Sequence, residues 1–268
     1  MKSYRRFLSL LVITCTLSNA SLLASETLLD FSDIEEKDAE MVSSLAALAR
    51  NEAATEAYEF TYEGQEFIVY PHVYSPKIFP STFFYINYMD ITPGQSFLEI
   101  GSGTGILALT AALRGANPVV ATDLSPIAVA NTTENIHRYG LNEVIDAREG
   151  SVFDPIKEGE TFDTILWNVP YMHIDKTDLS PIEMALYDPC YKALTRFFAE
   201  AKKYLKPNGK LWFGSSATHM HQDVLQKLVD TYGWSLRVIA EKTVTLPPIE
   251  GGAPAINVQL CEAMPIPS

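Results

Sequence analysis

A glycine-rich turn between an apolar strand and an apolar helix constrains the fold of this chain more than any other feature. The turn runs from Gly101 to Gly105 with glycine at every second position, and it follows the mostly apolar stretch 97–100. Glycine lets the backbone bend sharply and lets a ligand approach where any Cβ would collide. Asp123 comes eighteen positions after the last glycine, where its carboxylate can accept hydrogen bonds from both hydroxyls of a ribose. The pattern therefore predicts a strand–turn–helix unit built around a nucleoside.

The spacing of the glycines distinguishes between nucleoside cofactors. A dinucleotide fingerprint requires G-x-G-x-x-G, whereas Ile106 takes the place of its third glycine here. The G-x-G-x-G pattern, with Glu99 just ahead of it, resembles motif I of the class I S-adenosylmethionine (SAM) methyltransferases. A glycine turn without a ligand would leave the position of Asp123 unexplained. The resemblance implies SAM as the cofactor, with these binding residues: Glu99, Gly101, Ser102, Gly103, Gly105, Asp123, Leu124, Ser151, Val152 and Asn168.

Ser151 departs from the pattern of these methyltransferases. Relatives usually carry an aspartate there, which accepts a hydrogen bond from the adenine amino group. Serine also accepts a hydrogen bond but carries no charge, so adenine recognition is weakened or reassigned. We expect the change in cofactor affinity to be about 1 kcal/mol, the net contribution of one hydrogen bond.

A second motif, Asn168-Val169-Pro170-Tyr171, directly follows an apolar strand. It resembles the Asn-Pro-Pro-Tyr motif of methyltransferases that act on planar amino groups, among them the glutamine N5 and adenine N6 enzymes. The resemblance implies that the Asn168 side chain and the Val169 carbonyl accept hydrogen bonds from the target NH2, while Tyr171 packs on the flat group. Valine replaces the first proline, so the loop loses some stiffness but keeps its carbonyl. The alternative interpretation is an ordinary turn built from asparagine and proline.

Strand and helix patterns alternate through the rest of the chain, which is typical of a doubly wound α/β fold. The resemblance implies a Rossmann-like methyltransferase fold with a seven-stranded, mostly parallel sheet. Ligands in such sheets lie at the carboxyl ends of the strands. Strands are predicted at 96–100, 118–122, 144–149, 162–167, 210–214, 234–241 and 256–262, and helices at 104–114, 125–139, 189–205 and 219–232.

The chain divides into a leader at 1–20, an N-terminal extension at 21–90 and a methyltransferase domain at 91–268. Three basic residues and a short apolar run, followed by small residues ending at Ala20, are typical of a cleavable signal peptide. We therefore expect export, with action in a cytoplasm that contains SAM; a cytoplasmic protein with a retained leader is the alternative. The run is too short for a stable membrane span.

The extension is predicted to contain a helix and a β-hairpin. Ser32 and Glu35 form a capping box, which predicts a helix from about Asp33 to Tyr58. Alternating apolar and polar residues predict a hairpin from Phe60 to Tyr70 with its turn at Glu63-Gly64, and a short helix is expected at 83–89.

The charge of the chain bears on its partners. A net charge of −13 disfavours a nucleic-acid partner, because proteins that grip phosphates usually carry a basic face. His219 and His221 are too close together to be two ligands on one helical face, so we predict no metal site. His173 is expected to line the entrance of the site, or to accept a proton late in the reaction. The loop 246–254 is expected either to help select the acceptor or to be a surface loop without a functional role.

The two motifs together favour a SAM-dependent N-methyltransferase that acts on a planar amide or amino group. A protein glutamine side chain is the leading acceptor, followed by a small molecule and then by nucleic acid. A catalytically decayed SAM- or nucleoside-binding module remains an alternative, as does an aminopropyl transferase on the same fold. No feature of the sequence favours a particular oligomeric state.

Overall fold

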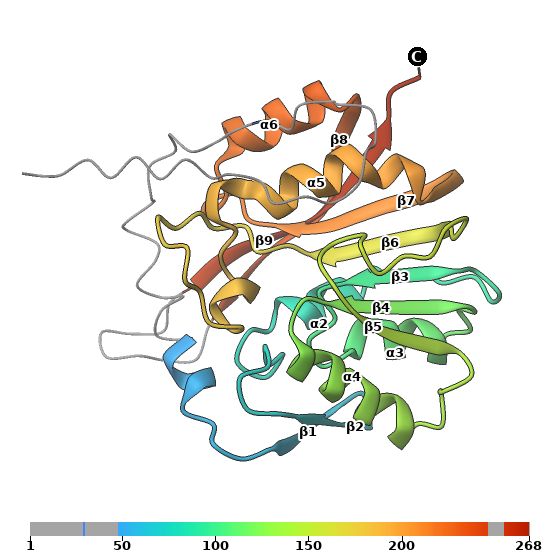
Figure 1. Ribbon diagram of the computed structural model, residues 1–268, viewed down its shortest axis with the longest axis vertical. Helices are drawn as coiled ribbons and strands as arrows, with labels where there is room; N and C mark the ends of the chain where they lie inside the picture. The colour runs from blue at the N-terminus through green and yellow to red at the C-terminus, as the bar shows by residue number, and fades with distance from the viewer. Residues whose placement is uncertain (1–28, 30–47, 246–254, 268) are drawn as a thin grey trace, which may run out of the picture.

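A seven-stranded sheet forms the centre of the computed structural model, which describes Leu29 and residues 48–245 and 255–267 (Figure 1). The strand order is β5-β4-β3-β6-β7-β9-β8, and β9 runs in the direction opposite to the other six strands. The strands are β3 (Phe97–Ile100), β4 (Val119–Asp123), β5 (Ile145–Glu149), β6 (Phe162–Asn168), β7 (Leu205–Ser215), β8 (Trp234–Thr245) and β9 (Ala255–Pro265). The predicted doubly wound, mostly parallel sheet is thereby confirmed.

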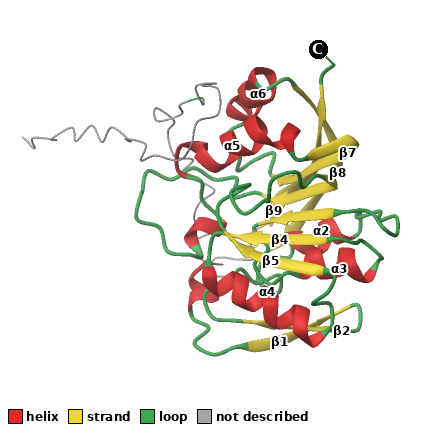
Figure 2. Cartoon of the chain, turned by 45° about the vertical axis from the view of Figure 1, so that its right-hand side comes forward, coloured by secondary structure: helices red, strands yellow, loops and turns green. Residues whose placement is uncertain are grey.

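Helices cover both faces of this sheet and enclose two hydrophobic cores (Figure 2). One face packs against α2 (Ser81–Ile86), α3 (Ile106–Leu113) and α4 (Pro126–Arg138), the other against α5 (Lys192–Glu200) and α6 (Gln222–Thr231). All four residues of β3 are buried because a strand in the middle of a covered parallel sheet has no solvent face. Because helices cover both faces, a ligand can reach the sheet only at the ends of its strands.

The predicted helix 189–205 is wrong as a single element. The structure divides it into the 3-10 turn η2 (Pro189–Tyr191), α5 and a second 3-10 turn, η3 (Ala201–Lys203). Cys190 and Tyr191 have φ angles of 56° and 48°, a left-handed conformation that interrupts the helical path. A further 3-10 turn, η1 (Glu183–Ala185), precedes this segment.

The extension contains the predicted hairpin, formed by β1 (Tyr58–Tyr62) and β2 (Gln65–Val69). Its two turn residues, Glu63 and Gly64, both have positive φ, as a tight two-residue hairpin turn requires. The predicted helix 33–58 is wrong at its end, because the chain is helical only to residue 52 and Tyr58 already belongs to β1. Residues 33–47 of that prediction lie outside the described residues.

Two buried asparagines of α4 fix the hairpin to the sheet domain. Asn131 Oδ1 accepts the Tyr70 N–H at 2.8 Å, and Asn135 Oδ1 accepts the Ile68 N–H at 2.9 Å. Both side-chain amides also donate to the Ile68 carbonyl. Because the edge of β2 is held in this way, the segment that follows it is carried across the carboxyl ends of the sheet strands.

The predicted leader 1–20 and the loop 246–254 lie outside the residues that the structure describes. Among residues 48–245 and 255–267, no helix has both the length and the hydropathy needed to cross a membrane.

Candidate active site

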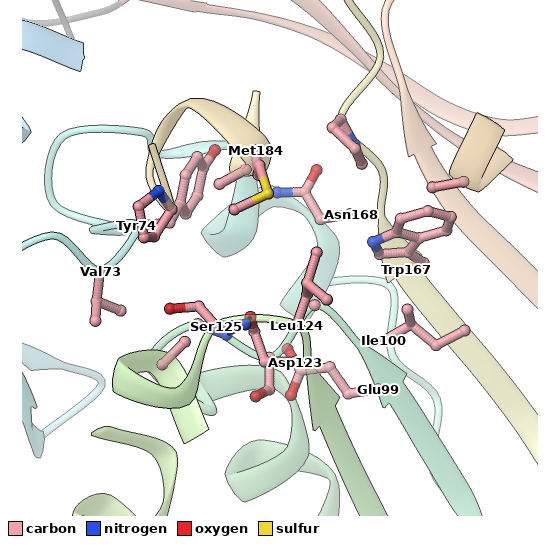
Figure 3. Close-up of a pocket in the computed structure, with 18 of the residues that line it drawn as sticks. Val73, Tyr74, Glu99, Ile100, Asp123, Leu124, Ser125, Trp167, Asn168 and Met184 are labelled. Carbon is pink, nitrogen blue, oxygen red and sulfur yellow. Dashed lines mark hydrogen bonds between the residues drawn. The ribbon is translucent and has the colours of Figure 1, made fainter. Parts of the chain in front are cut away.

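A cavity of about 250 Å³ lies at the carboxyl ends of β3, β4 and β6 (Figure 3). The residues that line it come from both motifs, from the end of β4, and from segments earlier and later in the chain. The predicted site residues that line it are Glu99, Gly101, Ser102, Gly103, Asp123, Leu124, Ser151, Val152, Asn168 and Pro170. Gly105, Val169 and Tyr171 are not among the lining residues.

The glycine turn takes a backbone path that other residues rarely adopt. Gly101 has a φ of 66°, and a Cβ there would lie 3.0 Å from Trp167 Nε1. Gly105 has a φ of 76° and caps α3, where a Cβ would lie 2.7 Å from Thr132 Cγ2. Gly101 therefore keeps the cavity wall open, while Gly105 allows α3 to pack on α4 rather than touching a ligand.

Asp123 sits at the end of β4 with its carboxylate held by backbone donors. One oxygen accepts the Gly103 N–H at 2.8 Å and the other accepts the Ser125 N–H at 2.9 Å. Burial raises the pKa of Asp123, and these backbone hydrogen bonds oppose that rise. Each carboxylate oxygen keeps acceptor capacity for a further donor. Leu124 follows with half of its surface exposed, so it adds an apolar wall beside the carboxylate.

Glu99 lines the cavity but also has a clear role in the fold. Its Oε2 accepts the Ala108 N–H at 2.8 Å, and Ala108 lies in the first turn of α3. Burial raises the pKa of Glu99 well above its ordinary value, and the nearby Asp123 adds to that rise. A carboxyl group at this position joins β3 to the positive end of α3.

Ser151 and Val152 follow β5 and border the same cavity. The Ser151 Oγ lies 3.4 Å from Nη1 of Arg196, whose guanidinium is also paired with Asp154 at 2.7 Å. Val152 has a φ of 50°, which turns the backbone at the cavity edge. An arginine therefore borders the position at which the resemblance to methyltransferases would place an aspartate.

The second motif begins at the last residue of β6. Asn168 lines the cavity, and its Cα pairs with that of Gly214 in β7. Val169 is buried and does not line the cavity. The Tyr171 carbonyl accepts the Tyr191 hydroxyl at 3.1 Å, which pins the loop to η2. The Tyr171 ring packs near His219 instead of lining the cavity.

Three residues that line the cavity belong to neither sequence motif. Trp167 and Tyr74 line the cavity (Figure 3), as does Asp188. Both Asp188 oxygens accept backbone N–H groups at the start of α5, from Ala193 and Leu194, and burial raises its pKa to about 6. An aspartate just before a proline and a helical pattern is a detectable N-cap signal, but nothing local places it at this cavity.

His173 is not at the entrance, which corrects that expectation. The side chain is buried, and its Nδ1 accepts the Cys190 N–H at 3.0 Å. This hydrogen bond ties His173 to the left-handed residue Cys190. Within the described residues, no three His, Cys, Asp or Glu side chains are grouped so that they could hold a metal ion.

The residues at the cavity fit SAM. A bend that only glycine tolerates, a buried carboxylate with spare acceptor sites and an apolar wall lie side by side. Such a set suits the ribose and the adenine of a nucleoside that carries no phosphate. With this fold and this cavity, the molecule is a class I SAM-dependent methyltransferase.

Comparison with known proteins places the chain within that class. A family model described as "Methyltransferase small domain" matches residues 64–242, and the chain belongs to this family. A release factor glutamine methyltransferase of Cereibacter sphaeroides is 30% identical, with 66% of each chain covered. A "Putative protein N5-glutamine methyltransferase" of Methanocaldococcus jannaschii is 29% identical over 62% of this chain and 83% of its own length.

Other matches are shorter or concern the fold alone. A ribosomal protein L11 methyltransferase of Desulforamulus reducens is 34% identical over 34% of this chain, but the match spans only 29% of that protein. The crystal structure of SMU.776 complexed with SAH superposes with a TM-score of 0.55 at 16% identity, covering 78% of this chain and 56% of the other. That structural likeness supports the methyltransferase fold.

Proposed function

We propose that this methyltransferase transfers a methyl group to the nitrogen of a planar amide, and that a protein glutamine side chain is its acceptor. The observation that carries the proposal is the position of Asn168, which lines the same cavity as the glycine turn and Asp123. An acceptor amide bound at Asn168 would lie beside the cofactor. A small-molecule amide or amine is the second acceptor class.

The chemistry requires alignment more than acid–base assistance. SAM, when bound, supplies a methyl group that its sulfonium has already activated. Orientation of a nucleophile in line with such a group contributes ~7 kcal/mol or more. The Asn168 side-chain oxygen and the Val169 carbonyl accept the two N–H bonds of the acceptor, which stabilises the positive charge that develops on nitrogen. As the N–C bond forms, the S–C bond of a bound donor would break with its electron pair going to sulfur, and the acceptor nitrogen would pass one proton to solvent.

The glutamine assignment draws support from two relatives whose matches cover most of both chains. The proteins of Cereibacter sphaeroides and Methanocaldococcus jannaschii carry glutamine methyltransferase names, and their matches cover 66% and 83% of their own lengths. The net charge of −13 also favours a protein or small-molecule acceptor over nucleic acid.

Two alternatives remain open to experiment. A decayed SAM- or nucleoside-binding module is favoured by the predicted export signal, by Val169 and by the uncharged Ser151. An aminopropyl transferase is disfavoured because those sites usually show acidic pairs where Asn168 stands. Titration with SAM followed by product analysis separates the three, since a binding module would take up SAM and release no product.

We also propose that residues 1–20 act as a signal peptide or leader, that residues 21–90 form an extension, and that the catalytic domain starts near residue 91. On this proposal the mature protein begins after Ala20 and works in a cytoplasm that contains SAM; the alternative is a cytoplasmic protein that retains its leader. Mass analysis of the mature N-terminus of a tagged full-length protein tests the cleavage. An uncut N-terminus would contradict it.

The direct test is transfer of labelled methyl from SAM to lysate fractions, before and after treatment with protease or nuclease. Label that protease removes from the protein fraction, and that complete enzymatic digestion releases as methylated glutamine, would support the proposal. Asn168→Ala should then lower kcat by about 10²-fold while the Kd for SAM changes less than threefold. Asn142→Ala, at an exposed turn before β5, is the matched control. Undiminished transfer by the Asn168 variant would refute the proposed role.

A further inference from the structure

Trp167, at the end of β6, brings to the cavity a hydrogen-bond donor that the protein itself does not use. The residue is only 5% exposed, yet it lines the cavity. Figure 3 shows the indole nitrogen at the end of the ring that faces the interior of the cavity, on the side of Leu124 and Asn168. Within the part of the chain that the structure describes, no group accepts a hydrogen bond from this nitrogen.

The other two tryptophans of the chain are placed differently. Trp234 Nε1 donates to the Phe198 carbonyl at 2.8 Å, whereas Trp212 Nε1 is enclosed in the core without a hydrogen-bond partner among the described residues. Neither residue lines the cavity. A buried tryptophan N–H normally has a hydrogen-bond acceptor. Of the three tryptophans, only Trp167 can therefore take its acceptor from a ligand in the cavity.

The packing around Trp167 fixes the direction of this donor. Its Cα pairs with those of Ile100 in β3 and Phe213 in β7, so the residue stands in the middle of the covered sheet. Its ring meets that of Phe197 from α5 edge to face, with 5.3 Å between the centroids. On the open side, a Cβ on Gly101 would lie 3.0 Å from Trp167 Nε1. The N–H is thus held beside the glycine turn, where we place the cofactor.

The neighbours of the donor favour a flat, uncharged ligand group. Ile100 and Val152 belong to the same apolar cluster as Trp167, and all three line the cavity. Leu124 adds a further apolar side chain. A carboxylate among these side chains would lose its hydration, and one neutral N–H would compensate for little of that loss. A purine buries its flat faces and carries nitrogen acceptors at its edge, so the adenine of SAM fits this position.

We propose that Trp167 binds the cofactor directly, by donating its indole N–H to a ring nitrogen of the adenine. This contact adds a side-chain donor to Ser151, whose hydroxyl the sequence assigns to the adenine amino group. Trp167 directly precedes Asn168, so one strand end supplies a group for the cofactor and a group for the acceptor. The inference concerns the cofactor alone and holds for any acceptor.

Trp167→Phe keeps an aromatic ring against Phe197 and removes the N–H. Calorimetric titration with S-adenosylhomocysteine (SAH), the form of the cofactor without its methyl group, should give a Kd about tenfold higher. Trp212→Phe is the matched control, because it shortens a buried tryptophan that does not line the cavity. Its Kd should change less than about twofold. A Kd for Trp167→Phe within about twofold of the unaltered protein would overturn the proposal.

Analogues of SAH distinguish a hydrogen bond from a change in packing. In deaza analogues, C–H replaces one of the ring nitrogens N1, N3 and N7, so each analogue lacks one candidate acceptor. Trp167→Phe should cost about tenfold in Kd for SAH and less than about twofold for the one analogue that lacks the bonded nitrogen. An equal cost for SAH and for all three analogues would overturn the proposal, because Trp167 would then act by filling space or by contacting another part of the cofactor.

The indole N–H can also be observed in the unaltered protein. In a sample labelled with 15N-tryptophan, the Trp167 indole signal is the one missing from Trp167→Phe. Saturating SAH should move this proton signal downfield by more than those of Trp212 and Trp234, which do not line the cavity. An unmoved Trp167 signal, or a protein that binds no SAH, would overturn the inference. The expected shift in a protein that transfers no methyl group would support the inference and refute only the proposed function.

Discussion

The two halves of the cavity are built in different ways. The cofactor half comes from adjacent stretches of chain, the glycine turn after β3 and Asp123 after β4, and it relies on backbone N–H groups and left-handed glycines. The half that we assign to the acceptor is assembled from segments on both sides of the cofactor half in sequence, with Tyr74 before it and Asn168 and Asp188 after it. Recognition of the common cofactor is thus local, whereas the acceptor side depends on how distant segments pack.

The largest expected effect tests the cofactor half. Asp123→Ala removes a carboxylate that can accept two ribose hydroxyls, and hydrogen bonds to charged groups contribute about 1.5–3 kcal/mol each. It also frees the Gly103 and Ser125 N–H groups. The Kd for SAM, measured by calorimetry, should rise more than about 100-fold.

Asp146→Ala provides the control for this experiment. Asp146 belongs to β5, pairs with Arg148 and Lys157 at the surface, and does not line the cavity. Its variant should bind SAM as the unaltered protein does. Equal Kd values for Asp123→Ala and the unaltered protein would contradict the assignment of the cofactor half.

Asp188 gives a prediction for the stability of the acceptor half. Burial raises its pKa from 3.8 to about 6, so the folded state holds this proton more tightly than the unfolded state. The contribution of Asp188 to stability is therefore most favourable below pH 4 and falls as pH rises to about 6. Each pKa unit corresponds to 1.36 kcal/mol, so the loss amounts to about 3 kcal/mol.

Urea unfolding at pH 4 and pH 7 measures this effect. Asp188→Asn cannot ionise, so the free energy of unfolding of the unaltered protein should fall more than that of the variant between these values. Asp154→Asn, at an exposed carboxylate paired with Arg196, is the control. A difference between pH 4 and pH 7 that is the same in the Asp188 variant and the unaltered protein would show that Asp188 is ionised without penalty in the fold.

The acceptor half is also sensitive to packing behind Asn168. Gly214→Ala places a methyl group against the Tyr85 hydroxyl and Asn168 Oδ1. Because displacement of a catalytic group by about 1 Å can cost ~10²-fold in rate, we expect a loss of that order in kcat, with the Kd for SAM changed less than threefold. Gly209→Ala, in the same strand, places a methyl group against the Leu205 side chain and the Lys206 carbonyl but does not line the cavity, so it should leave both values unchanged. If Gly214→Ala weakened SAM binding by the same factor as it lowered kcat, the two halves of the cavity would not be functionally separate.

The contrast also explains what the sequence could reveal. The glycine turn, Asp123 and Asn168 were predictable because each directly follows an apolar strand, and parallel strands bring their carboxyl ends together. Tyr74 and Asp188 were not, since their positions depend on hydrogen bonds from Asn131 and on a left-handed turn at Cys190. The same turn explains why the single helix predicted at 189–205 is divided.

The smallest expected effect concerns Ser151, which the sequence assigns to adenine recognition. Ser151 Oγ is 3.4 Å from Arg196, so one lone pair faces a guanidinium while the hydroxyl keeps capacity for a ligand. Ser151→Ala should weaken SAM binding by about 1 kcal/mol, roughly fivefold, whereas Ser235→Ala on the exposed part of β8 should have no effect. An unchanged Kd in Ser151→Ala would assign adenine recognition to the backbone around Val152. The left-handed turn at that residue would then serve the cofactor half as the glycines do, by backbone geometry alone.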